Sequence, residues 1–207
     1  IILFLAIMTW QTSHSLAPQK PLGTKAETLE IQVVSLDWKW LFIYPEQDIA
    51  TVNEVAIPVD VPVHFHVSSA SVMNSFFIPA LGSQIYAMAG MDNDVNLIAS
   101  EAGVYDGRST NYSGAGFSEM LFDARAMPQE KFEAWVDKVK QAPKSLTFNG
   151  TYPKLAEPSI DVPVLYFSDV SPELYRNIIE SFNNGRRGEG GNNGGDDEAP
   201  MSAEAAE

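Results

Sequence analysis

Residues 55–67 read VAIPVDVPVHFHV, and Val, Ile or Phe occupies every second position over all thirteen. This strict alternation has the period of a β-strand with one face buried and the other exposed. Pro58 and Pro62 interrupt the run. Because proline cannot donate a hydrogen bond to a neighbouring strand, each must lie on an edge, at a bulge or at a break between two strands. The stretch therefore predicts half-buried strands.

The same period continues on both sides of this run. Leu29, Ile31 and Val33 alternate with Glu30 and Gln32. Shorter strand-like segments follow at residues 95–99 and 121–126, with turn signals such as ALG at residues 80–82. Several short strands separated by turns are typical of an all-β sandwich. We therefore predict an all-β domain over residues 28–127.

From Pro128 the apolar period becomes helical. Residues 128–141 are predicted to form a helix with one aromatic face, because apolar side chains recur at i, i+3, i+4 and i+7: Phe132, Trp135, Val136 and Val139. A second helix is expected to start at Ser171-Pro172-Glu173, where a capping hydroxyl precedes a proline. Its apolar stripe is Leu174, Ile178, Ile179 and Phe182, and Asn183-Asn184-Gly185 should end it. We therefore predict a helical extension over residues 128–184.

The two ends of the chain differ in character. Residues 1–10 read IILFLAIMTW, which is shorter than the roughly 20 residues needed to span a bilayer. We expect residues 1–15 to be the outer end of a transmembrane helix with Trp10 at the interface, a buried core element being the alternative. Residues 16–27 should be a juxtamembrane linker, and the Gly-rich acidic tail at 185–207 should be disordered.

Composition excludes several classes of function. The 207 residues carry 13 basic and 27 acidic side chains, for a net charge of −14, which disfavours nucleic acid as a partner. The chain has no cysteine, so disulfides, thiolate catalysis and Cys-ligated metal sites are excluded. No Ser-His-Asp arrangement or phosphate-binding loop is visible.

Two segments, VMNSFFIP at residues 72–79 and STNYSGAGFSEM at residues 109–120, resemble the copper-ligand segments of subunit II of the haem-copper terminal oxidases. In the cytochrome c oxidase members, a His precedes Ser-Phe in the first segment, and the second reads Cys-x-Glu-x-Cys-x-x-x-His-x-x-Met. The resemblance implies vestigial ligand positions at Asn74, Ser109, Asn111, Ser113, Phe117 and Met120, where only Met120 keeps the family residue. A dinuclear copper centre needs bridging thiolates and imidazoles. We therefore expect no metal, no cofactor and no catalytic residue in this chain.

In lacking these copper ligands the chain resembles the ubiquinol oxidase branch of the family, the cytochrome bo type. The resemblance extends over residues 16–182 and includes VSLDWKW at 34–40, YPEQ at 44–47 and GSQIYAMAGM at 82–91. It implies a cupredoxin-like Greek-key barrel followed by an aromatic-rich extension. It also implies a non-redox, structural subunit II of a proton-pumping ubiquinol oxidase, with the haems and copper in subunit I.

The resemblance further implies where the protein works and with what. The expected partners are subunit I, other oxidase subunits and the membrane, with ubiquinol acting at the level of the complex and cytochrome c playing no part. The expected location is the bacterial inner membrane, with the globular domain on the periplasmic side. The alternatives are a divergent cytochrome c oxidase subunit II and a stand-alone, metal-free cupredoxin-like binding module.

Two further features have competing interpretations. His64 and His66 share one strand face. They suggest either a metal pair or an outward-facing polar pair, and we favour the polar pair because no third ligand has an identifiable place beside them. Trp38 and Trp40 lie where cytochrome c oxidases carry the aromatic cluster for electron entry. Without copper behind them, a role in packing or subunit docking is favoured.

Overall fold

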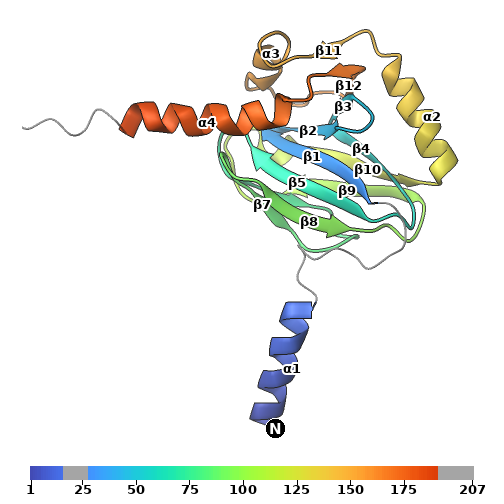
Figure 1. Ribbon diagram of the computed structural model, residues 1–207, viewed down its shortest axis with the longest axis vertical. Coiled ribbons are helices and arrows are strands. Elements are labelled where there is room, and N and C mark those ends of the chain that lie inside the picture. The colour runs from blue at the N-terminus through green and yellow to red at the C-terminus, as the bar shows by residue number, and fades with distance from the viewer. Residues whose placement is uncertain (16–27, 191–207) are drawn as a thin grey trace, which may run out of the picture.

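The computed structural model describes residues 1–15 and 28–190, in which two β-sheets pack face to face (Figure 1). The later helices lie along the top and flanks of this sandwich in Figure 1, and the N-terminal helix stands apart below it. The first sheet, in the order β12-β3-β2-β1-β5-β8, contains Leu165–Phe167, Ile49–Val52, Lys39–Tyr44, Leu29–Leu36, Val63–Ser69 and Asn93–Leu97. The second sheet, in the order β4-β10-β9-β6-β7, contains Glu54–Pro58, Leu121–Met127, Gly103–Ser109, Asn74–Phe77 and Ile85–Ala87. The predicted all-β sandwich is confirmed.

The proline-interrupted run at 55–67 forms two strands that belong to different sheets. β4 pairs in parallel with β10 in the second sheet, and β5 pairs in parallel with β1 in the first. Pro58 ends β4, and Pro62 lies just before β5, where its carbonyl accepts a hydrogen bond of 2.9 Å from Leu29 N. The break is therefore the point at which the chain crosses between the sheets. The expectation of half-buried strands is wrong for β4, which is buried on both faces.

The space between the sheets is filled largely by aromatic rings. Trp40, Phe42 and Phe65 from the first sheet meet Phe76 and Phe122 from the second. The rings of Phe76 and Phe122 are stacked with centroids 5.3 Å apart, and Trp40 packs edge-on against both. Offset and edge-to-face contacts of this kind add to the free energy gained by burying the rings.

Helix α2, Gln129–Lys140, confirms the helix predicted after Pro128. It buries the four side chains of the expected apolar face and contacts β4 and β3 at the end of the sandwich. The extension then adds α3, Tyr152–Ala156, the two-stranded parallel pair β11, Ser145–Leu146, and β13, Asp169–Val170, and finally α4, Leu174–Gly190. It closes a second apolar core over the outer face of the first sheet.

The predicted bounds of the last helix are wrong at both ends. The chain first makes a turn, closed by a hydrogen bond of 2.9 Å from Leu174 N to Ser171 O, and α4 begins at Leu174. The helix does not end at residues 183–185 but runs to Gly190. The Asn183 amide donates to Gly90 O at 3.2 Å, so this side chain docks the helix on the sandwich. The expectations for the linker at 16–27 and the tail beyond residue 190 lie outside the described residues.

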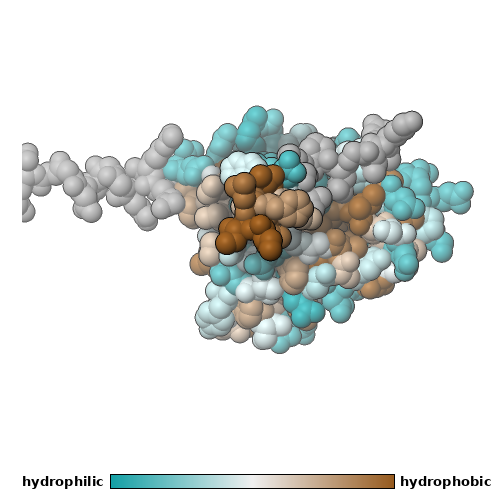
Figure 2. Space-filling view, turned by 90° about the horizontal axis from the view of Figure 1, so that it is seen from below, coloured by the Kyte–Doolittle hydropathy of each residue, from teal (hydrophilic) through white to brown (hydrophobic). Residues whose placement is uncertain are grey.

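Helix α1, Ile2–Ser15, exposes most of its apolar surface. Ile2, Leu3, Phe4 and Trp10 are 86%, 75%, 69% and 67% exposed, and in Figure 2 hydrophobic side chains gather at the centre of the view, where this helix points toward the viewer. In the described part of the chain, no helix has the length and apolarity required to cross a membrane. The interpretation of residues 1–15 as the outer end of a membrane helix stays a prediction.

Candidate functional site

Asn74 and Ser109 meet across the neighbouring strands β6 and β9. Asn74 is 1% exposed, and its amide nitrogen donates to Ser35 Oγ at 2.7 Å. Its amide oxygen accepts a hydrogen bond from Ser109 Oγ at 3.1 Å. Ser35 lies on β1, so this polar network joins the two sheets inside the protein. Sequence reasoning missed Ser35, because which residue faces Asn74 depends on how the sheets pack.

The loop after β9 carries Asn111 and Ser113. The Asn111 amide donates to Met73 O at 2.9 Å, which ties the loop to the segment before β6. The carbonyl of Ser113 accepts a hydrogen bond of 3.1 Å from Trp38 Nε1. Its hydroxyl oxygen is buried and has no hydrogen-bond partner in the described part of the chain. Ser113 therefore turns a polar atom inward at a position where the family pattern has a cysteine.

Phe117 and Met120 complete the set of expected positions. Phe117 begins the short 3-10 turn η1, Phe117–Glu119, and its ring lies against Tyr112 with centroids 5.7 Å apart. Met120 is 1% exposed, and its carbonyl accepts a hydrogen bond of 3.2 Å from Ser109 N. Asn74, Ser109 and Met120 are thus joined by hydrogen bonds, and Phe117 is tied to Met120 because its carbonyl accepts a hydrogen bond of 3.2 Å from Met120 N. Ser113 lies in the loop between β9 and η1.

Trp38 and Trp40 have different roles. Trp40 lies in the core, which confirms its packing role. Trp38 adopts a positive φ of 63° and covers the loop. A Cβ added at Gly116 would lie 2.5 Å from Trp38 Cγ, so only glycine fits beneath the indole. The proposed docking role of Trp38 stays a prediction.

Lys39, between the two tryptophans, joins the loop region to the C-terminal extension. Its ammonium group donates to Glu157 O at 2.7 Å and to Ser159 Oγ at 2.6 Å. Desolvation by burial lowers the pKa of this lysine, and the nearby carboxylates of Asp37 and Glu157 oppose that shift. The side chain thus stabilises the extension from inside the protein.

The donor atoms at the six vestigial positions do not fit a dinuclear copper centre. They are two amides, two hydroxyls, a phenyl ring and one thioether, and no thiolate or imidazole stands among them. Copper pairs of this kind need soft bridging sulfur ligands, and hydroxyl and amide oxygens are hard donors. The arrangement can instead hold two sheets and a loop together through neutral hydrogen bonds.

Replacing Asn74 with Ala should lower the free energy of unfolding by about 1–3 kcal/mol, because Ser35 and Ser109 are buried and would each lose a partner. Chemical denaturation followed by tryptophan fluorescence measures this change. Asn149→Ala, at an exposed position far along the chain, is the matched control and should change stability by less than about 0.5 kcal/mol. Equal stability of the two variants would contradict the role given to the network.

The histidine pair has neighbours that sequence reasoning did not find. His64 and His66 face away from the core, as expected, but Glu30, Asp92 and Asp94 all lie within 3.5 Å of an imidazole nitrogen. The interpretation that no third ligand has a place beside the pair is therefore wrong. Hydrogen bonding to Asp92, opposed by desolvation, is the main cause that raises the pKa of His66 to about 9.

Two family models match the chain. The model of the periplasmic domain of cytochrome c oxidase subunit II matches residues 44–127, which hold all six vestigial positions. The COX aromatic rich motif matches residues 140–186, which include most of the C-terminal extension.

Curated relatives agree with these matches. The chain is 58% identical over 182 residues to the cytochrome bo(3) ubiquinol oxidase subunit 2 of Pseudomonas aeruginosa, covering 88% of this chain and 55% of that protein. It is also 58% identical over 187 residues to the ubiquinol oxidase subunit 2 of Acetobacter aceti, covering 89% of this chain and 60% of that protein. The chain thus spans little more than half the length of these relatives.

A solved structure supports the fold. The periplasmic domain of subunit II of cytochrome oxidase from Bradyrhizobium japonicum superposes with a TM-score of 0.53 at 24% identity, covering 56% of this chain and 96% of that domain. This likeness confirms the expected cupredoxin-like architecture. The chain therefore belongs to the cytochrome c oxidase subunit II family, in the branch of the ubiquinol oxidase subunits 2.

Proposed function

We propose that this protein is the non-redox, structural subunit II of a terminal ubiquinol oxidase. The complex would oxidise ubiquinol and reduce oxygen to water while translocating protons. The observation that carries the proposal is the set of side chains around Asn74 and Ser109. At these positions of the family's copper ligands, neutral side chains are joined by hydrogen bonds. A subunit with these side chains has no acceptor for an electron from a soluble donor.

The electron path follows from that chemistry. Cytochrome c is water-soluble, and its electron needs an acceptor near the surface of the exported domain. Ubiquinol is apolar and reaches the membrane part of an oxidase through the bilayer, so no relay in this domain is needed. The haems and copper would then reside in subunit I, and this chain would support assembly and cover the outer face of that subunit.

The location and partners belong to the same proposal. The exposed apolar side chains of α1 suit a lipid environment or the flank of a membrane subunit. We place the globular domain on the periplasmic side of the bacterial inner membrane, in contact with subunit I and the other oxidase subunits.

The test is a comparison of electron donors on the assembled complex purified with this chain. Oxygen consumption is measured with reduced ubiquinol and with reduced cytochrome c, each at about 0.01 M and about 0.1 M salt, where the Debye length falls from about 30 to about 10 Å. We expect turnover with ubiquinol and negligible turnover with cytochrome c at both salt concentrations. The net charge of −14 can attract a basic cytochrome, but attraction without an acceptor gives no turnover.

A cytochrome c oxidase that contains a copper-bearing subunit II serves as the positive control for the reduced cytochrome. Salt-sensitive oxidation of cytochrome c without ubiquinol turnover would assign the chain to a divergent cytochrome c oxidase. A complex inactive with both donors, alongside an active control, would favour the stand-alone binding module.

A further inference from the structure

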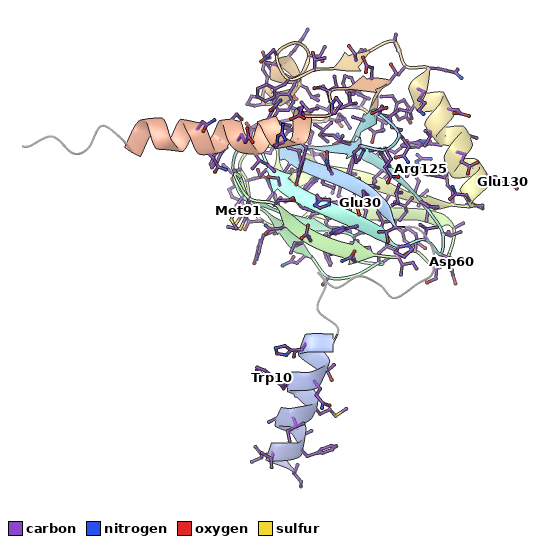
Figure 3. The ribbon with its side chains drawn as sticks, viewed as in Figure 1. Trp10, Glu30, Asp60, Met91, Arg125 and Glu130 are labelled. Carbon is purple, nitrogen blue, oxygen red and sulfur yellow. The ribbon has the colours of Figure 1, made fainter. Side chains whose placement is uncertain are left out.

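Five titratable side chains gather on the outward face of the first sheet, away from the vestigial copper positions. Glu30 lies on β1, His64 and His66 on β5, and Asp94 on β8, and Asp92 directly precedes that strand. The register places Glu30 beside His64 and His66 opposite Asp94. Figure 3 shows Glu30 on this face. Adjacent strands of one sheet form a rigid frame, so the spacing of these groups is fixed by the fold.

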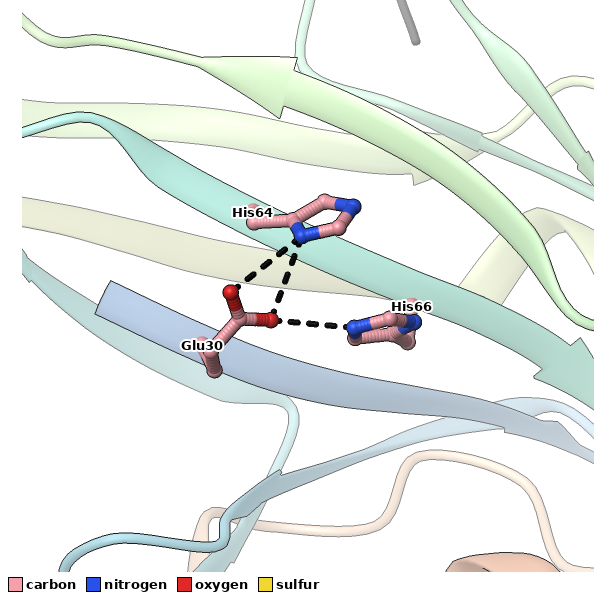
Figure 4. Close-up of side chains that lie close together, drawn as sticks. All are labelled: Glu30, His64 and His66. Carbon is pink, nitrogen blue, oxygen red and sulfur yellow. Dashed lines mark hydrogen bonds and ion pairs between the residues drawn. The ribbon is translucent and has the colours of Figure 1, made fainter. Parts of the chain in front are cut away.

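One nitrogen of each imidazole points at the Glu30 carboxylate. His66 Nε2 lies 2.9 Å from Glu30 Oε2, and His64 Nδ1 lies 3.2 Å from the same oxygen (Figure 4). The two rings lie 4.4 Å apart, centroid to centroid. One ligand atom from each of the three residues falls within 4.8 Å of the other two. Ligand atoms around a tetrahedral zinc ion, with bonds of about 2.0–2.2 Å, lie about 3.3–3.5 Å apart, so a small expansion makes room for an ion.

The other nitrogen of each imidazole faces an aspartate. His66 Nδ1 lies 3.1 Å from Asp94 Oδ1 and 3.2 Å from Asp92 Oδ2, and His64 Nε2 lies 3.5 Å from Asp94 Oδ1. Asp92 in turn accepts a hydrogen bond of 2.7 Å from the Tyr175 hydroxyl on α4. Metal-bound histidines in proteins donate their second nitrogen to a carboxylate in this way, which fixes the tautomer and the ring orientation.

We infer that Glu30, His64 and His66 form a binding site for one divalent transition-metal ion of the Zn²⁺ class. Two imidazole nitrogens and one carboxylate oxygen suit Zn²⁺, Co²⁺ or Ni²⁺ and disfavour Mg²⁺ and Ca²⁺, which prefer oxygen ligands alone. The three side chains are 26–35% exposed, so water can supply the remaining ligand. The site is separate from the Asn74 network and does not depend on the proposed oxidase function.

Two other arrangements are open to these groups: a metal-free network of protonated histidines and carboxylates, and an ion held by His66, Asp92 and Asp94, whose ligand atoms also lie within 4.8 Å of one another. Binding to the purified 207-residue chain tests for the metal-free network, and Glu30→Gln, which leaves the second set of ligands intact, separates the two metal sites. We expect calorimetry with Zn²⁺ to give one ion per chain and excess Mg²⁺ to leave that binding unchanged. Co²⁺ should produce the visible absorption of a nitrogen-ligated, four-coordinate ion. Glu30→Gln and His66→Gln should each weaken Zn²⁺ binding by at least about tenfold, and Asp92→Asn by about 10–100-fold through the outer shell.

His14→Gln is the matched control, because His14 is the one histidine outside the pair and lies on α1. It should leave the affinity unchanged. Circular dichroism and thermal melting with EDTA show whether each variant folds, and the Co²⁺ spectrum of the unaltered chain tests the site even where a variant does not. Absence of stoichiometric Zn²⁺ binding would overturn the inference in favour of the metal-free network. An affinity of Glu30→Gln or His66→Gln equal to that of the unaltered chain, or displacement of Zn²⁺ by Mg²⁺, would also overturn the inferred site.

Discussion

Replacing Trp135 with Ala is expected to lower the free energy of unfolding by about 3–5 kcal/mol. The indole is 9% exposed and lies between the rings of Tyr44, Phe132 and Tyr166, with centroids 5.6, 6.1 and 6.3 Å away. Truncation leaves a cavity between α2 and the sandwich that the rigid sheets cannot fill by collapse. Urea unfolding of the wild-type and variant chains measures the change.

Part of the expected loss comes from Glu54, a carboxylate that is only 4% exposed. Its Oε1 accepts hydrogen bonds from Trp135 Nε1 at 3.1 Å and from the Tyr166 hydroxyl at 2.7 Å, and its Oε2 lies 2.7 Å from Arg125 Nε. The same carboxylate contributes to raising the pKa of Tyr166 to about 12, where desolvation is the main cause. A buried charge that loses a donor destabilises the fold, because water cannot replace the missing partner.

Two further variants separate packing from hydrogen bonding. Trp135→Phe keeps most of the ring but removes the donor to Glu54, and should be about 1–3 kcal/mol less stable than wild type. Lys131→Ala, on the exposed face of α2, should change stability by less than about 0.5 kcal/mol. If Trp135→Ala costs less than about 1 kcal/mol, α2 does not pack on the sandwich in solution.

The elements with clear periodicity were predictable from the sequence. The alternation at Leu29, Ile31 and Val33, the break between Pro58 and Pro62, and the apolar face of α2 all appear in the structure. In β1 and α2 one face of a single element is buried, and such burial leaves a pattern along the chain. The break was predictable for another reason, because proline cannot donate a hydrogen bond to a neighbouring strand. The end of α4 was predicted wrongly: the helix runs through Asn183-Asn184-Gly185 to Gly190, and the Asn183 amide donates to Gly90, a residue far away in sequence.

In the candidate sites, too, residues that belong to a sequence pattern were predictable, and their partners from distant strands were not. The family pattern located Asn74 and Ser109, but the partner Ser35 depends on how β1 packs over β6. Glu30 is likewise one of several glutamates in the sequence, and only the parallel pairing of β1 with β5 brings it beside His64. Contacts between strands distant in sequence leave no local signal, so the metal site on the outer face could be recognised only in three dimensions.

Restoring the family's copper ligands is expected to give a chain that holds two copper ions. The variant combines five substitutions and retains Met120: N74H, S109C, N111E, S113C and F117H. The framework for it is already present, because Asn74, Ser109 and Met120 are joined by hydrogen bonds and the buried Ser113 hydroxyl points inward. Two thiolates supply the bridging sulfur that the present side chains lack. Ser35 Oγ, which now pairs with the Asn74 amide, is placed to orient the new imidazole at position 74.

The measurement is copper content per chain together with the near-infrared band of a mixed-valence copper pair. The matched control carries N74H, N111E and F117H but keeps Ser109 and Ser113, and should show no such band, because imidazoles and a carboxylate alone cannot bridge two copper ions through sulfur. His64→Gln and His66→Gln in the background of both variants remove the separate imidazole cluster, so that copper bound there is not counted. A folded fivefold variant that stays colourless after copper is added would mean that residues 72–79 and 109–120 do not align with the family's ligand segments as inferred, and would remove the main support for the structural, non-redox role.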